Sequence, residues 1–133
     1  CRPRMGWDAR RLEELGPPVS HYTDAVRFGD LLFISGIVAT DGDGNVLGKG
    51  DPVAQARRIF ENMGKILVAE GCGFGDVLKV TVFLRNMEHR VLINPVRQEV
   101  FGESRPASTL VEIAKLVDPE MLVEIEAIAG VPS

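Results

Sequence analysis

The spacing of hydrophobic positions changes along the chain, and it predicts where helices and strands lie. Between residues 53 and 67, apolar side chains recur every three or four positions, which is typical of an amphipathic helix. Asp51-Pro52 stands before this segment as a helix start signal, and Gly71 follows it as a stop signal. The pattern therefore predicts a helix between Asp51 and Gly71.

Short apolar segments on both sides of this helix predict strands. Residues 26–28 and 31–38 are separated by Gly29-Asp30, which indicates a hairpin with a tight turn, and residues 77–84 alternate as a third strand. Residues 41–45 place oxygen ligands at alternate positions, but Val46 stands where a calcium loop needs glycine. We predict a turn there and no metal site.

The remaining segments complete the expected order of elements. Residues 88–101 have helical character, with Pro95 near a helix start or at a kink and the strongest part from Asn94 onward. Residues 107–116 and 121–129 predict two strands joined by a turn at Asp118-Pro119. Residues 8–15 have the spacing of a short helix. The main elements therefore follow the order ββαβαββ, which favours a two-layer α+β domain.

One face of the expected sheet has no obvious cover. Residues 31–38 carry too few polar positions for either face of that strand to lie in water. A large apolar surface on a soluble protein typically marks an interface. We therefore expect the chain to self-associate.

Composition limits the class of protein. With 133 residues, 45% of them hydrophobic, we expect one domain over residues 20–133 after an N-terminal extension at 1–19. A net charge of -4 opposes binding to a phosphate backbone, so no nucleic-acid partner is expected. Cys1 and Cys72 share no metal-ligand spacing and form no disulfide framework, which favours a cytoplasmic setting. No apolar run reaches membrane-spanning length, so we expect no membrane partner.

Several motifs resemble the RidA family, also called YjgF/YER057c/UK114. They are Phe33-Ile34-Ser35-Gly36, Val80-Thr81-Val82-Phe83, the segment from Arg105 to Leu116, and Val123-Glu124-Ile125-Glu126-Ala127. The resemblance covers residues 20–129 and implies a chorismate-mutase-like fold, assembled as a homotrimer with three clefts between subunits. It also implies hydrolysis of reactive 2-imino or 2-enamino acids to 2-oxo acids and ammonia, with no cofactor.

The resemblance implies roles for individual residues. Glu124 matches the glutamate that handles the attacking water, Tyr22 matches a cleft tyrosine, and Asn94 matches an asparagine that lines the cleft. Ser35 and Gly36 match the strand end beside the ligand. Structural alternatives stay open, since Glu124 could pair with a cation, Tyr22 could be an interface aromatic, and Asn94 could cap a helix.

Ser108 departs from the family, whose matching residue is an arginine that grips the substrate carboxylate. A hydroxyl cannot reproduce the planar, two-pronged contact of a guanidinium, so we expect small 2-imino acids to be poor substrates. Arg105 and Thr109 lie close to this position in the sequence. Arg105 is one possible source of the missing cation, although an offset of three residues along a strand points it to the opposite face.

Three functional hypotheses remain. The first is a hydrolytic deaminase that acts on another imine or enamine metabolite, and the second is a non-catalytic metabolite-binding or regulatory protein with the same fold. An endoribonuclease is the most distant hypothesis, because the net charge is negative and the sequence offers no pair of acid-base histidines. Glu124 and Tyr22 favour the deaminase.

Overall fold

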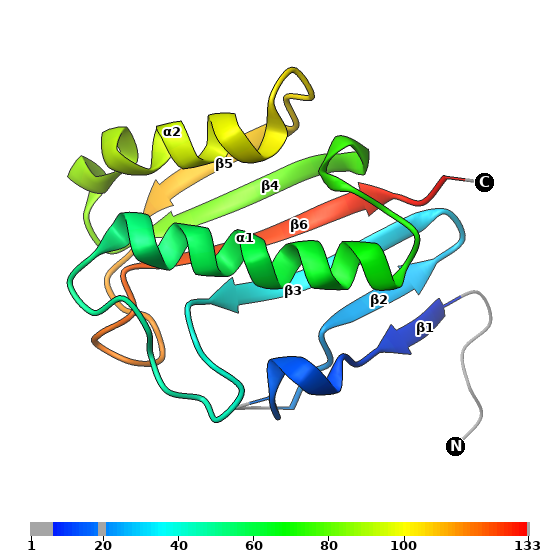
Figure 1. Ribbon diagram of the computed structural model, residues 1–133, viewed down its shortest axis with the longest axis horizontal. Helices are drawn as coiled ribbons and strands as arrows, with labels where there is room; N and C mark the ends of the chain where they lie inside the picture. The colour runs from blue at the N-terminus through cyan, green and yellow to red at the C-terminus, as the bar shows by residue number, and fades with distance from the viewer. Residues whose placement is uncertain (1–6, 19–20, 133) are drawn as a thin grey trace.

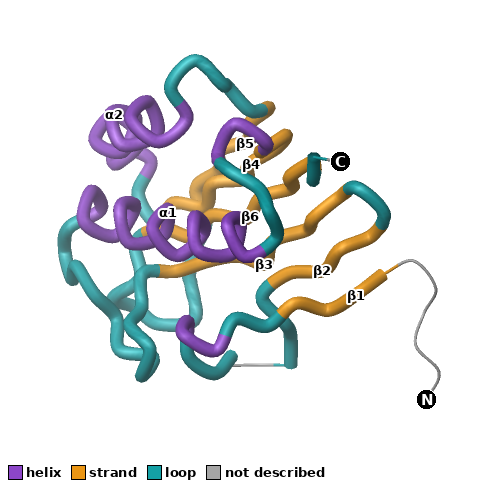
Figure 2. Tube along the Cα trace, turned by 45° about the vertical axis from the view of Figure 1, so that its right-hand side comes forward, coloured by secondary structure: helices purple, strands orange, loops and turns teal. Residues whose placement is uncertain are grey.

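The computed structural model describes residues 7–18 and 21–132, which form one six-stranded sheet with two helices lying across one of its faces (Figure 1). The strands are β1 (Trp7–Arg10), β2 (Ala25–Phe28), β3 (Leu31–Val38), β4 (Val77–Leu84), β5 (Ala107–Glu112) and β6 (Val123–Gly130). The helices are α1 (Pro52–Ala69) and α2 (Arg90–Phe101), with short 3-10 turns at Glu13–Leu15, Phe74–Asp76 and Met87–His89. Figure 2 shows both helices on the same side of the strands, which confirms the predicted two-layer α+β architecture.

The strands follow the order β1-β2-β3-β6-β4-β5 across the sheet. The last strand in the sequence, β6, lies in the middle of the sheet and runs antiparallel to both β3 and β4. At one edge, β5 runs parallel to β4, and α2 makes the connection between them. The central position of β6 brings the C-terminal part of the chain against the N-terminal hairpin.

The last two strands depart from the predicted topology. The pattern predicts a strand pair over residues 107–116 and 121–129, but β4 lies between β5 and β6, and β5 already ends at Glu112. The turn at Asp118 is confirmed, because the Met121 amide donates to the Asp118 carbonyl at 3.0 Å. Alternating hydrophobicity identifies a strand but does not specify its neighbour, which is why the pairing was wrong.

The N-terminal segment also differs from its prediction. In place of a helix over residues 8–15, Trp7–Arg10 forms β1, which pairs antiparallel with β2, and only Glu13–Leu15 is helical. The carboxylate of Asp24 accepts the Leu12 amide at 2.5 Å and so holds this segment against the body. Eight residues are too few for their spacing to separate a strand from a helix. The segment predicted to be an extension therefore contributes an edge strand.

Helix α1 confirms the prediction for the segment after Asp51. The Asp51 carboxylate accepts the Ala54 amide at 3.0 Å, as expected of a residue that caps a helix. One side of the helix is fully buried through Ile59, Met63 and Leu67, which belong to the core beneath β3 and β6. Within residues 7–18 and 21–132, no helix has both the length and the apolar character that crossing a membrane requires.

A buried glutamine on α1 fastens the segment that leads into β6. The Nε2 group of Gln55 donates to the Glu120 carbonyl at 2.9 Å, and its Oε1 accepts the Leu122 amide at 2.8 Å. These bonds satisfy backbone groups in a segment without a strand partner. Gln55 therefore helps to set where β6 begins.

Helix α2 lies within the predicted range of residues 88–101, but its start is not at Asn94. Its first residue is Arg90, so Asn94 is its fifth residue and does not cap it. The turn before the helix begins at Asn86, whose side chain accepts the Glu88 amide at 2.9 Å. Pro95 lies inside the helix, where it lacks the amide that would donate to the Val91 carbonyl. Pro95 is the sixth residue of the helix, so it does not mark the helix start.

The sheet face opposite the helices stays uncovered within one chain. Phe28, Leu31 and Phe33 lie on this face and are 54%, 39% and 42% exposed. Val111 of β5 is exposed on the same face. These residues confirm the predicted apolar second face, and self-association through it stays a prediction.

Candidate functional site

The centre of the candidate site is an irregularity in β3 that lies against the side chain of Glu124 of β6. The pairing of these strands shifts between Ile34 and Ile37, so Ser35 and Gly36 lie in a bulge. A Cβ atom at Gly36 would lie 2.8 Å from both Cδ and Oε2 of Glu124. The Glu124 carboxylate therefore packs directly on the backbone of Gly36, and a larger residue would displace it.

The same bulge positions Tyr22. The Ser35 hydroxyl donates to the Thr23 carbonyl at 2.6 Å, and the Ser35 amide donates to the Asp24 carbonyl at 3.0 Å. These two bonds hold residues 22–24 beside the bulge. Tyr22, which is 45% exposed, and Glu124 consequently line the same cleft.

We call this cavity of about 280 Å³ the Glu124 cleft. Its polar side chains are Tyr22, Asp24, Ser35, Thr40, Asp41 and Glu124, and its apolar ones include Leu15, Val38, Val117 and Met121. The volume and the mixed lining suit a small polar metabolite.

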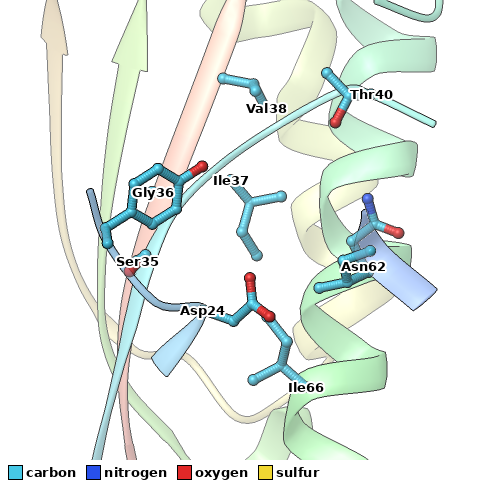
Figure 3. Close-up of a pocket in the computed structure, with 10 residues that line it drawn as sticks. Asp24, Ser35, Gly36, Ile37, Val38, Thr40, Asn62 and Ile66 are labelled. Carbon is cyan, nitrogen blue, oxygen red and sulfur yellow. The ribbon is translucent and has the colours of Figure 1, made fainter. Parts of the chain in front are cut away.

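A smaller cavity of about 70 Å³ adjoins the Glu124 cleft and shares Asp24 and Ser35 with it. Figure 3 shows Asp24 between the strand that carries Ser35 and the helix that carries Asn62. The Asn62 side chain is buried, and its Oδ1 atom has no hydrogen-bond partner among the described residues. A polar cavity of this size has room for about two water molecules beside the larger cleft.

Glu124 has the electrostatic character of an acid-base group. Burial raises its pKa above the usual value of 4.5, and the negative charge of Glu126 on the same strand face raises the pKa further. Among the described residues, no ion pair includes Glu124, so a cation partner does not offset these effects. A carboxyl group with a raised pKa is a stronger base than an ordinary carboxylate.

The other predicted site residues lie on α2 and β5. Asn94 and Arg105 line a groove between α2 and the start of β5, together with Arg97, and we call it the Arg97 groove. Ser108 accepts a hydrogen bond from the Arg97 guanidinium at 2.7 Å. Thr109 faces the open side of the sheet, where its hydroxyl accepts from Lys79 Nζ at 2.6 Å.

Within one chain, the Glu124 cleft and the Arg97 groove are well separated. Glu124 pairs with Phe83, which pairs with Val111, three residues beyond Ser108 on β5. Two strand spacings and three residues along a strand place the Cα atoms of Glu124 and Ser108 about 14 Å apart. Their side chains also lie on opposite faces, because Ser108 pairs with the buried Val80. The structure thus gathers Tyr22, Ser35, Gly36 and Glu124 in one place and Asn94, Arg105 and Ser108 in another.

Two residues of these sites were missed by sequence reasoning. Arg97 follows Asn94 by three positions, which places both on one helix face, and this spacing was an available signal. Asp24 had no local signal, since its role depends on the approach of Arg11 and Leu12 from the segment that follows β1. In the part of the chain that the structure describes, no group of three or more acidic, histidine or cysteine side chains could hold a metal ion.

Known proteins resemble the chain over most of its length. The sequence profile of the family described as Endoribonuclease L-PSP matches residues 13–131. The 3-aminoacrylate deaminase RutC of Acinetobacter baylyi is 36% identical over 115 residues, which are 86% of this chain and 90% of that protein. The 2-iminobutanoate/2-iminopropanoate deaminase of Mus musculus is 36% identical over 111 residues, 84% and 82% of the two chains. The crystal structure of RidA from an Antarctic Psychrobacter bacterium has a TM-score of 0.85 at 30% identity and covers 92% of this chain and 98% of that one.

Proposed function

The chain belongs to the RidA (YjgF/YER057c/UK114) family, and from this premise we propose that it is a hydrolytic deaminase of a reactive imine or enamine metabolite. Two relatives are named for deamination of such compounds, a 3-aminoacrylate and a 2-iminobutanoate or 2-iminopropanoate. The observation that carries the proposal is Glu124, a partly buried carboxyl group with a raised pKa and no cation partner among the described residues, which lines a cleft together with Tyr22.

In the proposed reaction, Glu124 acts first as a base and then as an acid. The substrate reacts as its protonated imine, and the Glu124 carboxylate accepts a proton from water as the water oxygen attacks the imine carbon, which produces a neutral carbinolamine. The protonated Glu124 then gives this proton to the carbinolamine nitrogen, and the carbon–nitrogen bond breaks so that ammonia leaves with the bonding electron pair. As the carbonyl group forms, the hydroxyl proton passes to the Glu124 carboxylate and from there to solvent. An enamine first gains a proton on carbon and reacts as the imine. One water is consumed for each ammonia released, and Tyr22 can orient the substrate with its hydroxyl group.

We also propose that the complete site forms between copies of the chain. One chain holds Glu124 and Ser108 about 14 Å apart on opposite sheet faces, so a single small substrate cannot contact both. The open apolar face carrying Phe33 provides a surface on which copies can pack. In a homotrimer, the Glu124 cleft of one chain can meet the Arg97 groove of its neighbour.

The lining of the cleft favours this proposal over an endoribonuclease. Among the described residues, Asp41 and Glu124 give the cleft two carboxyl groups outside any ion pair, which repel a phosphate backbone. A binding protein with the same fold would keep the cleft without turnover. Measured hydrolysis therefore separates the deaminase from both alternatives.

The experiment compares the wild type with Glu124→Gln, which keeps the shape of the side chain and removes the base. An amino-acid oxidase generates the imine in the assay mixture. The rate at which the carbonyl product forms is compared with the rate of spontaneous hydrolysis in buffer without the protein. We expect kcat/KM to fall by about 10² or more in Glu124→Gln. In the wild type, the rate should rise with pH through the raised pKa of Glu124, because only the ionised form accepts a proton.

The neighbouring Glu126→Gln provides a matched comparison. It removes a negative charge that raises the pKa of Glu124, so its rate profile should shift to lower pH while the activity at neutral pH is kept. Equal activity of Glu124→Gln and the wild type would assign Glu124 a structural role. Absence of hydrolysis for every imine, with tight binding of a metabolite, would favour the binding protein.

A further inference from the structure

Arg97 reaches from the helix layer to Ser108 on β5, the position where the family resemblance implies an arginine. Its guanidinium donates to the Ser108 hydroxyl at 2.7 Å. Ser108 pairs with Val80, so its side chain points to the same side of the sheet as α2. This hydrogen bond uses one of the five N–H groups of the guanidinium and keeps the cation beside Ser108.

The Arg97 side chain is partly buried without a carboxylate partner. Burial lowers the pKa of its guanidinium, which nevertheless stays charged at neutral pH. Among the described residues, no ion pair includes Arg97, whereas Arg57 and Arg58 of α1 each contact a glutamate, at 2.7 Å and 3.1 Å. A partly buried cation without a counterion is stabilised when an anion binds to it.

The surroundings of Arg97 suit a carboxylate in particular. Asn94 lies three residues earlier on the same helix face and adds a neutral donor, and Arg105 lines the same groove as a second cation. Glu103 also lines the groove, but it forms no ion pair with Arg97 or Arg105. A guanidinium with free N–H groups can hold both oxygens of a carboxylate.

We infer that Arg97 is the specificity-determining residue of this chain, which binds the carboxylate of its substrate in place of the arginine that Ser108 replaces. The substrate is then an imine or enamine that carries a carboxylate. This inference rests on the proposed function and names its substrate class. It also revises the expectation from Ser108 alone, because the cation comes from α2 and not from β5.

The test moves the cation between the two positions. Four proteins are compared with the wild type on 2-iminobutanoate generated in place: Arg97→Gln, Arg97→Lys, the double variant Arg97→Gln/Ser108→Arg, and Arg90→Gln as the control. Arg90 is an exposed arginine at the first residue of α2, so its loss should leave kcat/KM unchanged. Arg97→Gln should lower kcat/KM by about 10- to 100-fold or more, and Arg97→Lys should lower it less.

The kcat/KM of the double variant should be at least about tenfold higher than that of Arg97→Gln, because the double variant returns a guanidinium to the strand. A purely structural role of Arg97 would not be rescued in this way. No recovery in a double variant that melts like the wild type would therefore overturn the inference. Unchanged activity of Arg97→Gln would also overturn it, while the proposed deaminase would stand if Glu124→Gln were inactive.

A binding measurement keeps the two proposals distinguishable. Calorimetry with 2-oxobutanoate, the stable product of 2-iminobutanoate hydrolysis, should show binding to the wild type and binding weakened by at least about tenfold in Arg97→Gln. Binding that depends on Arg97, without hydrolysis of any imine, would support the carboxylate site and refute the deaminase. Equal binding by both proteins, or no binding by the wild type at millimolar concentration, would refute the carboxylate site.

Discussion

At the scale of single residues, the candidate site depends on the contact between Gly36 and the carboxylate of Glu124. Alanine at position 36 would put a methyl group 2.8 Å from Cδ of Glu124, which is closer than real Cβ atoms approach other atoms. Gly36→Ala should therefore displace Glu124 from the cleft or move β3 away from β6. We expect a loss of about 1 to 3 kcal/mol in the free energy of unfolding, measured in urea, and a loss of deaminase activity.

Gly73→Ala is the matched control for this substitution. A Cβ atom at Gly73 would have nothing within 4 Å, and the backbone there does not need a positive φ. Its free energy of unfolding should stay within about 0.5 kcal/mol of the wild type. If Gly36→Ala were as stable and as active as Gly73→Ala, the bulge would be able to relax, and the close contact would not define the site.

At the scale of elements, Gln55 couples α1 to the segment that leads into β6. It is fully buried, and Gln55→Leu would leave the Glu120 carbonyl and the Leu122 amide without their partners. We expect this substitution to lower the free energy of unfolding by about 3 kcal/mol, since each unpaired buried group is costly. Urea unfolding measures the change, and Gln98→Leu on the exposed side of α2 should change it little. A Gln55→Leu protein as stable as Gln98→Leu would mean that water replaces both bonds.

At the scale of the whole molecule, the proposed site is complete only if copies of the chain pack on the open sheet face. We expect sedimentation at micromolar concentration to give a trimer, with three times the 14.5 kDa mass of the chain. Phe33→Glu places a charge on the open face and should dissociate the assembly, because a charge without a partner is not tolerated in an apolar interface. Deaminase activity should be lost with the trimer.

Val68→Glu is the comparison for the assembly experiment. Val68 is 73% exposed on α1, on the other side of the sheet from Phe33, so its replacement should leave the trimer intact. A folded Phe33→Glu protein that still sediments as a trimer would place the interface elsewhere. An active monomer would show that the Glu124 cleft works without a neighbouring chain.

Local sequence patterns were sufficient for elements whose ends depend on nearby residues. Asp51 and Gly71 bracket α1 because a cap and a stop act within a few residues, and residues 77–84 were predicted with the bounds that β4 has. The helix predicted over residues 8–15 was wrong, since pairing with β2 makes Trp7–Arg10 a strand. The position of β6 between β3 and β4 could not be predicted, because alternation along one strand carries no information about its partners.

By itself, the sequence determined the α+β class, most of the elements and the apolar second face, while the roles of Glu124 and Tyr22 stay predictions that the family resemblance implies. Only the tertiary structure decided how these residues meet. The register between β3 and β6 brings Gly36 onto Glu124, and the parallel pairing of β4 and β5 turns Ser108 toward Arg97. Such contacts join residues far apart in the chain, so they depend on the packing of whole elements and leave no local pattern.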